Sequence, residues 1–185
     1  MVLLVVVCVC ISNWSTICSV LGKIGTLYNY NSDQISYLGM AYILSGIMGN
    51  FIIGPLAIIQ NRHKFYMVLL AVSGVFADVA LTGTLQLESF SVTMVLGCIA
   101  GFLNMPNLPV GMSLVTRVAF PVGEAMSIGL ILTVSTALSA GEIALCEFLM
   151  EKYPDQVVIG STISIGILIV MKVLSLLALN FLRGK

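Results

Sequence analysis

The sequence predicts an all-α, polytopic membrane protein that forms a single bundle over residues 1–185. Three observations support this prediction. Of the 185 residues, 59% are hydrophobic and only 9% are charged, whereas soluble domains carry about 25% charged residues. The apolar residues gather in six stretches of roughly 20 residues, the length that an α-helix needs to cross a bilayer. Polar and turn-forming residues are concentrated in the breaks between these stretches.

The first three predicted spans cover 2–22, 35–59 and 66–87. The apolar start, MVLLVVVCVCI, lacks the positive region and small-residue cleavage site of a signal peptide. We interpret it as a membrane span whose upstream flank is missing. The breaks after the first two spans, NYNSDQ and QNRHK, contain the polar residues that helix connections favour.

The last three predicted spans cover 91–114, 124–146 and 157–181. They are bounded by the breaks LES, TRVAFPVGE and EKYPDQ. Apolar runs of this length indicate helices, because strands of a membrane barrel would be about 10 residues long and alternate in polarity.

The composition also limits the function. The formal net charge is zero, so no basic surface for a nucleic acid is expected. All five cysteines fall in apolar runs without the spacing of metal ligands. They are interpreted as small buried hydrophobes, and no metal or cofactor is predicted.

The basic residues predict an orientation in the membrane. Six spans place both termini on one side, and that side carries Arg62, Lys64, Arg117, Arg183 and Lys185. The opposite side carries Lys23 and Lys152. By the positive-inside rule both termini are predicted to be cytoplasmic, and the plasma membrane is the expected location.

The turn between the fourth and fifth spans combines three residues with separate roles. Arg117 is expected in the headgroup region, Pro121 is expected to end the fourth helix, and Glu124 favours the N-terminus of the fifth through the helix dipole. Together with Arg62 and Lys64 of the other basic loop, they are the candidate gating or structural residues.

The same turn, FPVGEAMSIGL at Phe120–Leu130, resembles a family within the major facilitator superfamily. The family is that of the feline leukaemia virus subgroup C receptor-related proteins, transporters associated with choline, ethanolamine and haem. The segment is similar to the turn between their tenth and eleventh helices. Gly101–Gly111 resembles the preceding helix, and Gly49–Tyr66 resembles the eighth helix and its basic loop, without the family's late acid.

The resemblance implies that this chain is the C-terminal half of a twelve-helix carrier. Such a carrier consists of two bundles, each a 3+3 inverted repeat, with substrate bound between them near the bilayer midplane. Spans one, two, four and five would line the cavity, while three and six would be peripheral. The partner would be the N-terminal half or a second copy of the chain.

Five residues are candidates for substrate binding: Asn13, Trp14, Ser15, Asn104 and Thr136. Trp14 offers an aromatic face for a quaternary ammonium, or it is a packing residue. By the resemblance, Trp14 matches one member of an aromatic pair in the family's ligand site, and Ser15 replaces the other member. Asn104 precedes Pro106 and Pro109, which leave backbone carbonyls without their helical hydrogen bonds. These carbonyls line a cavity, or the prolines form a kink at which Asn104 supplies the missing hydrogen bonds. Thr136 corresponds by resemblance to a ligand-contacting glutamine, or it bonds to its own helix.

Asp78 and Lys172 are the charges expected deep in the membrane. At the helical rise, Lys172 lies about 16 Å above Arg183 and Asp78 about 21 Å above Lys64, so their side chains are expected to reach one another. Three alternatives remain for this pair: a proton or ion relay, a structural ion pair, or a neutral Asp78 with a snorkelling Lys172. Glu142 is expected to be hydrated near the outer surface, and His63 to be solvated in its loop.

Three functions follow for consideration. The first is transport of a small organic solute by alternating access, with a choline- or ethanolamine-like amine or haem as substrate. The second is a membrane enzyme, which the scattered acids and single histidine do not favour. The third is a truncated or non-transporting six-helix protein that needs a partner half.

Overall fold

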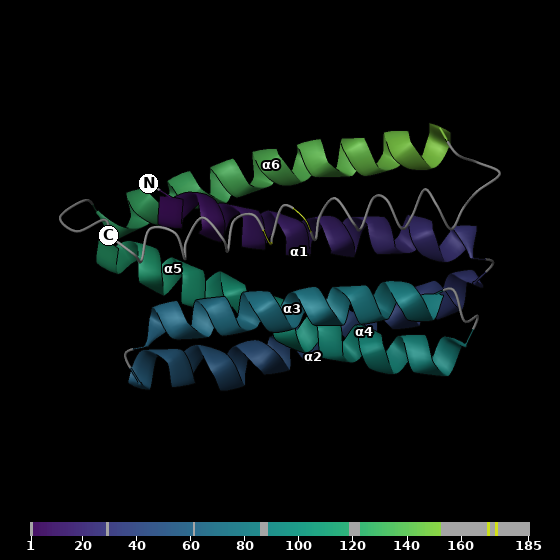
Figure 1. Cartoon of the computed structure of the whole chain (residues 1–185), viewed down its shortest axis with the longest axis horizontal. Helices are drawn as coiled ribbons and strands as arrows, with labels where there is room; N and C mark the ends of the chain where they lie inside the picture. The colour runs from purple at the N-terminus through teal and green to yellow at the C-terminus, as the bar shows by residue number, and fades with distance from the viewer. Residues whose placement is uncertain are drawn as a thin grey trace.

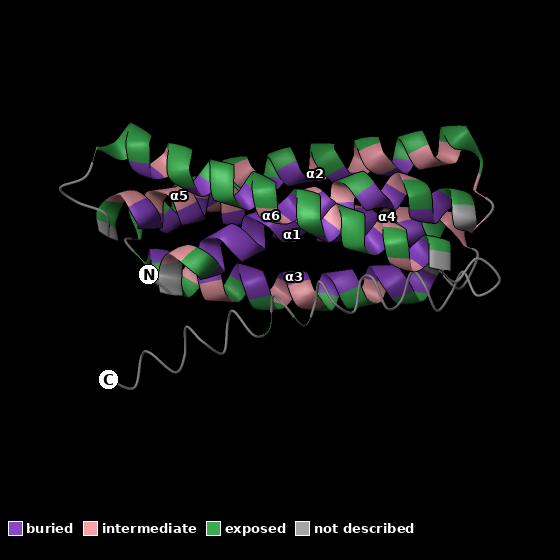
Figure 2. Ribbon diagram, turned by 90° about the horizontal axis from the view of Figure 1, so that it is seen from above, coloured by how far each residue is buried: buried purple, intermediate pink, exposed green. Residues whose placement is uncertain are grey.

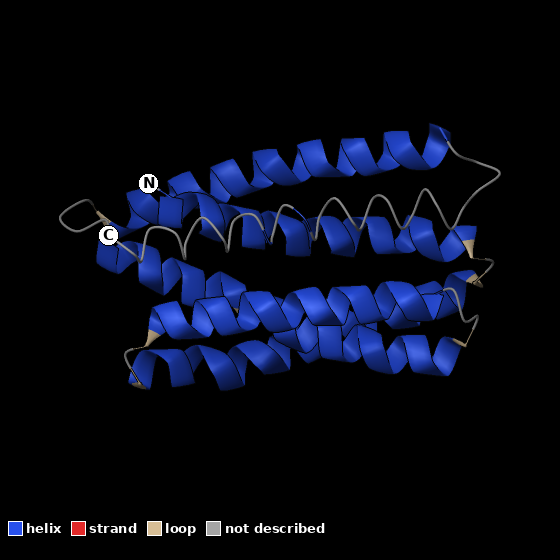
Figure 3. Ribbon diagram, in the orientation of Figure 1, coloured by secondary structure: helices blue, strands red, loops and turns tan. Residues whose placement is uncertain are grey.

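The structure is a computed structural model in which every described element is an α-helix (Figure 3). It describes residues 2–28, 30–60, 62–85, 89–118 and 123–152, together with Val170 and Val173. The helices are α1 (Val2–Leu27), α2 (Ser32–Ile59), α3 (His63–Leu85), α4 (Phe90–Asn104), α5 (Asn107–Val118) and α6 (Glu124–Lys152). The predicted all-α class is confirmed for these residues.

Five helical stretches are long and apolar enough to cross a membrane. They are Leu4–Thr26, Ser32–Ile59, His63–Thr84, Phe90–Arg117 and Glu124–Glu151, and the fourth combines α4 with α5. They confirm the first five predicted spans, with differences of a few residues at the ends. The sixth predicted span, 157–181, lies outside the described residues except for Val170 and Val173, which are helical. The described part of the chain is therefore that of a multi-pass membrane protein.

The helices run side by side along the long axis of the molecule (Figure 1). Short connections reverse the chain after α1, α2, α3 and α5, so neighbours in sequence are antiparallel. The most extensive contacts join α2 to α4, α1 to α6, and α3 to α4. One end of the bundle therefore carries the start of α1 and the α2–α3 and α5–α6 connections. We call it the N-terminal end.

The outer faces of the helices are exposed (Figure 2), and many of the side chains on them are apolar. Large hydrophobic side chains remain exposed along α2, α3 and α6, including Phe51 at 77%, Phe76 at 71% and Met126 at 75%. Exposed apolar surface on this scale is unfavourable in water, whereas hydrocarbon solvates it without penalty. The surface therefore agrees with the composition that predicts a lipid environment.

Glycines allow α2 and α4 to approach closely. Gly46 and Gly49 of α2 are buried against Met105 and the Phe102 carbonyl, and Gly101 of α4 lies against the Tyr42 carbonyl. Small residues of this kind allow membrane helices to gain dispersion contacts that lipid tails do not supply.

Replacing Gly101 by alanine is expected to destabilise the bundle. The new Cβ would meet the Tyr42 carbonyl oxygen and the Ser45 hydroxyl, and overpacking of this kind costs about 1–3 kcal/mol. Gly129→Ala is the matched control, because nothing lies within 4 Å of a Cβ placed there. Thermal unfolding in detergent should show a lower Tm for Gly101→Ala alone. Equal Tm values for the two variants would contradict the close α2–α4 contact.

Candidate functional site

The fourth span is broken near its middle, between α4 and α5. Pro106 and Pro109 lack the backbone N–H that an uninterrupted helix needs, and Met105 and Pro106 form a turn. The Leu108 amide donates to the Met105 carbonyl at 3.1 Å instead of to Asn104. The Asn104 carbonyl is thereby left without its usual helical donor, and it accepts a 3.0 Å hydrogen bond from the Asn107 side-chain amide instead. The predicted interruption at these asparagines and prolines is confirmed.

The break is tied to the neighbouring helix by a buried carboxylate. The Asn104 side-chain amide donates to Asp78 Oδ1 of α3 at 2.8 Å. Asp78 is 3% exposed and Asn104 is 1% exposed. The fully buried Tyr42 of α2 lies within electrostatic range of Asp78 and of the Asn104 amide. Three helices thus converge on one polar cluster, which we call the break cluster.

Asp78 lies at membrane depth. Its span runs from His63 to Thr84, so Asp78 is about 7 Å from the middle of that span at the helical rise. An ionisable residue at this depth is costly unless it is hydrogen-bonded, and it usually marks a functional position. Lys172 lies outside the described residues, so its approach to Asp78 stays a prediction.

A second carboxylate is buried between α1 and α6. Glu142 is 8% exposed and accepts hydrogen bonds from the hydroxyls of Ser12 at 3.0 Å and Thr16 at 2.8 Å. The Thr16 and Ser139 hydroxyls are 3.2 Å apart. We call Ser12, Thr16, Ser139 and Glu142 the α1–α6 cluster.

The expectation that Glu142 is hydrated near the outer surface was wrong. Its depth was counted from Glu124, but α6 extends to Lys152, a length of about 43 Å that exceeds the hydrocarbon core. Glu142 is only about 7 Å from the middle of its span. The signal that identifies it is helical spacing, because Ser135, Ser139 and Glu142 share one face of α6.

The predicted substrate-binding residues do not form one cluster among the described contacts. Asn13 is 1% exposed, and Trp14 packs against the apolar core while its indole N–H is enclosed without a described acceptor. Ser15 is half-buried. Thr136 is exposed on α6 and donates to its own helix at the Leu132 carbonyl. Asn104 lies in the break cluster, so its side chain is already engaged by Asp78.

The predicted gating residues gather at the N-terminal end of the bundle. Arg62, Lys64, Arg117 and Glu124 are exposed there, and Glu124 begins α6 as expected. Pro121 lies outside the described residues. The expectation that His63 is solvated was wrong: it is 4% exposed, and its Nδ1 lies 3.1 Å from the Ser113 hydroxyl of α5.

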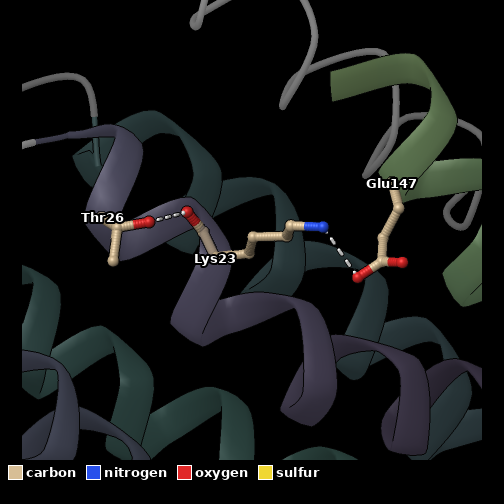
Figure 4. A network of polar contacts seen from close by, with 3 residues as sticks. All are labelled: Lys23, Thr26 and Glu147. Atoms are coloured by element: carbon tan, nitrogen blue, oxygen red, sulfur yellow. Dashed lines mark hydrogen bonds and ion pairs between the residues drawn. The ribbon is translucent and has the colours of Figure 1, made fainter. Parts of the chain in front are cut away.

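The opposite end of the bundle holds an ion pair between α1 and α6 (Figure 4). Lys23 Nζ lies 2.9 Å from Glu147 Oε1, and both side chains are 45% exposed. Thr26 donates to the Lys23 carbonyl in the preceding turn of the same helix. An exposed pair of this kind contributes about 0–1 kcal/mol, so it positions the two helix ends more than it stabilises them.

A recess of about 460 Å³ opens between α1, α5 and α6 at the N-terminal end. Its lining is apolar apart from Ser127, whose hydroxyl donates to the Gly123 carbonyl of its own chain segment. The recess therefore offers little recognition for a polar solute. Within the described residues no group of three or more His, Cys, Asp or Glu side chains is arranged to hold a metal ion.

Asn104 and Asp78 are expected to be energetically coupled. Asn104→Ala removes a donor from a buried carboxylate, and Asp78→Ala leaves a buried amide without that acceptor, so each should cost about 1–3 kcal/mol of unfolding free energy. The double variant should cost clearly less than the sum of the two. Unfolding in detergent measures all three variants against Asp33→Ala, an exposed control on α2. Additive losses would show that the hydrogen bond contributes nothing.

Comparison with known proteins supports a transporter. No protein-family model matches the chain. Over 106 residues, which are 57% of this chain, it is 19% identical to the uncharacterized MFS-type transporter C09D4.1 of Caenorhabditis elegans. The matched region spans 18% of the length of that relative. The chain is thus similar to part of a transporter of the major facilitator type.

Proposed function

We propose that this chain is one half of a major facilitator-type carrier that moves a small organic solute by alternating access. The observation that supports it most is the broken helix at membrane depth, with Asn104 bound to the Asp78 carboxylate. Transporters build their binding sites from such discontinuous helices, because the interrupted backbone and nearby polar groups face a cavity there. The similarity to an MFS-type transporter supports the same proposal.

The proposed architecture has six helices in a 3+3 inverted repeat, with the sixth formed within residues 157–181. The motifs at Phe120–Leu130, Gly101–Gly111 and Gly49–Tyr66 favour the family related to the feline leukaemia virus subgroup C receptor. An N-terminal half, or a second copy of the chain, completes the carrier in this proposal.

A choline- or ethanolamine-like amine is the proposed substrate. Two carboxylates, Asp78 and Glu142, are buried in the bundle, and they favour a positively charged solute over the carboxylates of haem. Trp14 is only partly buried, and the face of its indole ring is the group proposed to attract the cation. Asn13, Ser15 and Thr136 complete the proposed set of substrate-binding residues.

In the proposed mechanism the break between α4 and α5 acts as the hinge. The Asn107 side chain joins the two halves of the span by its hydrogen bond to the Asn104 carbonyl, and the Asn104 side chain binds Asp78 of α3. These side-chain hydrogen bonds exchange partners more readily than a continuous helical ladder. Arg62, Lys64, Arg117, Pro121 and Glu124 would form the gate at the N-terminal end. No nucleotide-binding motif is recognised in the sequence, so a gradient would drive the cycle.

A radiolabel uptake assay tests the proposal. Cells that express the chain, alone and together with a complementary half, are supplied with labelled choline, ethanolamine or haem. Trp14→Ala should raise the KM for choline about 2–30-fold, the range that corresponds to a cation–π interaction of 0.5–2 kcal/mol. Thr133→Ala is the control, because this exposed hydroxyl bonds only to its own helix.

Uptake of haem without choline would replace the amine by haem as substrate. If no labelled solute enters with either expression format, the alternative function gains support: a truncated or non-transporting six-helix protein.

The proposed location is the plasma membrane, with both termini cytoplasmic. Single cysteines introduced at Arg62 and at Glu151, both exposed and at opposite ends of the bundle, report the orientation in a background without the native cysteines. An impermeant maleimide applied to intact cells should label position 151 and leave position 62 unmodified until the membrane is permeabilised. Labelling of position 62 from outside would reverse the orientation.

A further inference from the structure

The α1–α6 cluster contains one carboxylate and three hydroxyls, all shielded from solvent. Ser12 and Thr16 are 0% exposed, Ser139 is 3% exposed and Glu142 is 8% exposed. Each carboxylate oxygen of Glu142 has its own hydroxyl partner, Ser12 for Oε1 and Thr16 for Oε2. No described ion pair involves Glu142, whereas Glu147, on the same helix, is paired with Lys23.

The Ser12 hydroxyl has a choice between two acceptors. Its oxygen lies 3.0 Å from Glu142 Oε1 and 3.1 Å from the carbonyl oxygen of Val9. A hydroxyl has one hydrogen to donate and lone pairs with which to accept. Ser12 therefore donates either to Glu142 or to Val9, and in the second case its oxygen is free to accept.

This choice allows the cluster to be fully hydrogen-bonded with or without one extra proton. When Glu142 is ionised, Ser12 donates to Oε1 and Thr16 donates to Oε2. When a proton binds to Oε1, the Ser12 hydroxyl turns to the Val9 carbonyl, and the new acid O–H donates to the Ser12 oxygen. Thr16 still donates to Oε2 and accepts from Ser139, so neither state leaves a buried polar atom unpaired.

We propose that Glu142 is a proton-binding site across the α1–α6 contact, with Ser12 as the rotating hydroxyl that accommodates the proton, and that it couples solute transport to a proton gradient. The coupling rests on the transport function proposed above. Proton binding changes the charge between α1 and α6, so it changes the free energy of their contact, through which the proton would influence the transport cycle.

Several of the other titratable or charged groups on the helices around Glu142 have partners of their own or lie at the helix ends, while the buried Cys146 lies one turn from Glu142 on α6. Among the helices α1 to α6, the main contacts of α6 are with α1 and α5. On α1, Cys8 donates to the Ile131 carbonyl and Lys23 is paired with Glu147. On α5, Arg117 lies in the last turn, at the N-terminal end of the bundle. The remaining groups on α1 and α6 are Cys10, Cys18, Glu124, Cys146, Glu151 and Lys152.

Infrared difference spectroscopy between acidic and alkaline pH tests the site without any transport. The chain in lipid nanodiscs should show the carbonyl stretch of a protonated carboxylic acid, which disappears on ionisation. Glu142→Gln, which keeps one donor and one acceptor in place, should remove this band. Glu147→Gln, an exposed acid on the same helix, should leave it. The other carboxyl groups of the chain, including the buried Asp78, give bands of their own, so the test is the component of the signal that Glu142→Gln removes and Glu147→Gln retains. If Glu142→Gln removes no component of the protonated-acid signal, or the unmodified chain shows no such signal, the proposal is overturned.

Variants of Ser12 test the rotating hydroxyl. Ser12→Ala removes the acceptor for the acid proton, so the band should shift to the frequency of a weakly hydrogen-bonded acid. Ser12→Thr keeps a hydroxyl and should retain the original band. Ser73→Ala on α3, whose hydroxyl bonds only to the Leu70 carbonyl of its own helix, is the control. An unshifted band in Ser12→Ala overturns the role of Ser12.

Uptake measured with and without an imposed proton gradient tests the coupling. The unmodified carrier should respond to the gradient, and Glu142→Gln should lose the response while Glu147→Gln keeps it. A titrating Glu142 in a carrier whose uptake ignores the gradient overturns the coupling and leaves the transport function standing. Absence of uptake in every variant removes the transport function, while the infrared titration still decides whether Glu142 binds a proton.

Discussion

The absence of water around the buried polar groups is the constraint on which this structure depends. In hydrocarbon, a donor or acceptor must find its partner within the protein, because none is available outside. At the break between α4 and α5, the Asn107 amide nitrogen binds the Asn104 carbonyl and the Asn104 amide nitrogen binds the Asp78 carboxylate, while Asn107 Oδ1 is enclosed without a described partner. The cluster between α1 and α6 meets this requirement with three hydroxyls around Glu142.

The two main helix contacts satisfy that constraint in different ways. Between α2 and α4 the contacting residues include small ones, and the glycines let the two backbones approach closely at Gly46, Gly49 and Gly101. Between α1 and α6 the contact is polar at its centre and ionic at one end. Close backbone packing keeps α2 and α4 in place, because moving one helix against the other would create either steric overlap or a void, and both are costly. Hydrogen bonds that can be exchanged make the α1–α6 contact the one suited to adjustment.

The spans and the break could be predicted from sequence because they follow from local properties. Hydropathy located five helices to within a few residues, and the prolines at 106 and 109 placed the interruption. The environments of Glu142 and His63 could not be predicted this way, because each depends on a residue far along the chain. Glu142 is enclosed by Ser12 and Thr16, and His63 by Ser113. Depth counted along one helix gives the height of a side chain but not the direction in which it points.

The separation in sequence between Glu142 and its partners has a consequence for biosynthesis. Ser12 and Thr16 are synthesised before the carboxylate that they bind, which follows 130 and 126 residues later. When α6 leaves the translocon, an acid near the middle of its span opposes insertion by about 2.5–3.5 kcal/mol. An α1 helix that is already folded offers immediate hydrogen-bond donors to that acid. The hydrogen bonds from α1 are therefore expected to lower the cost of inserting α6.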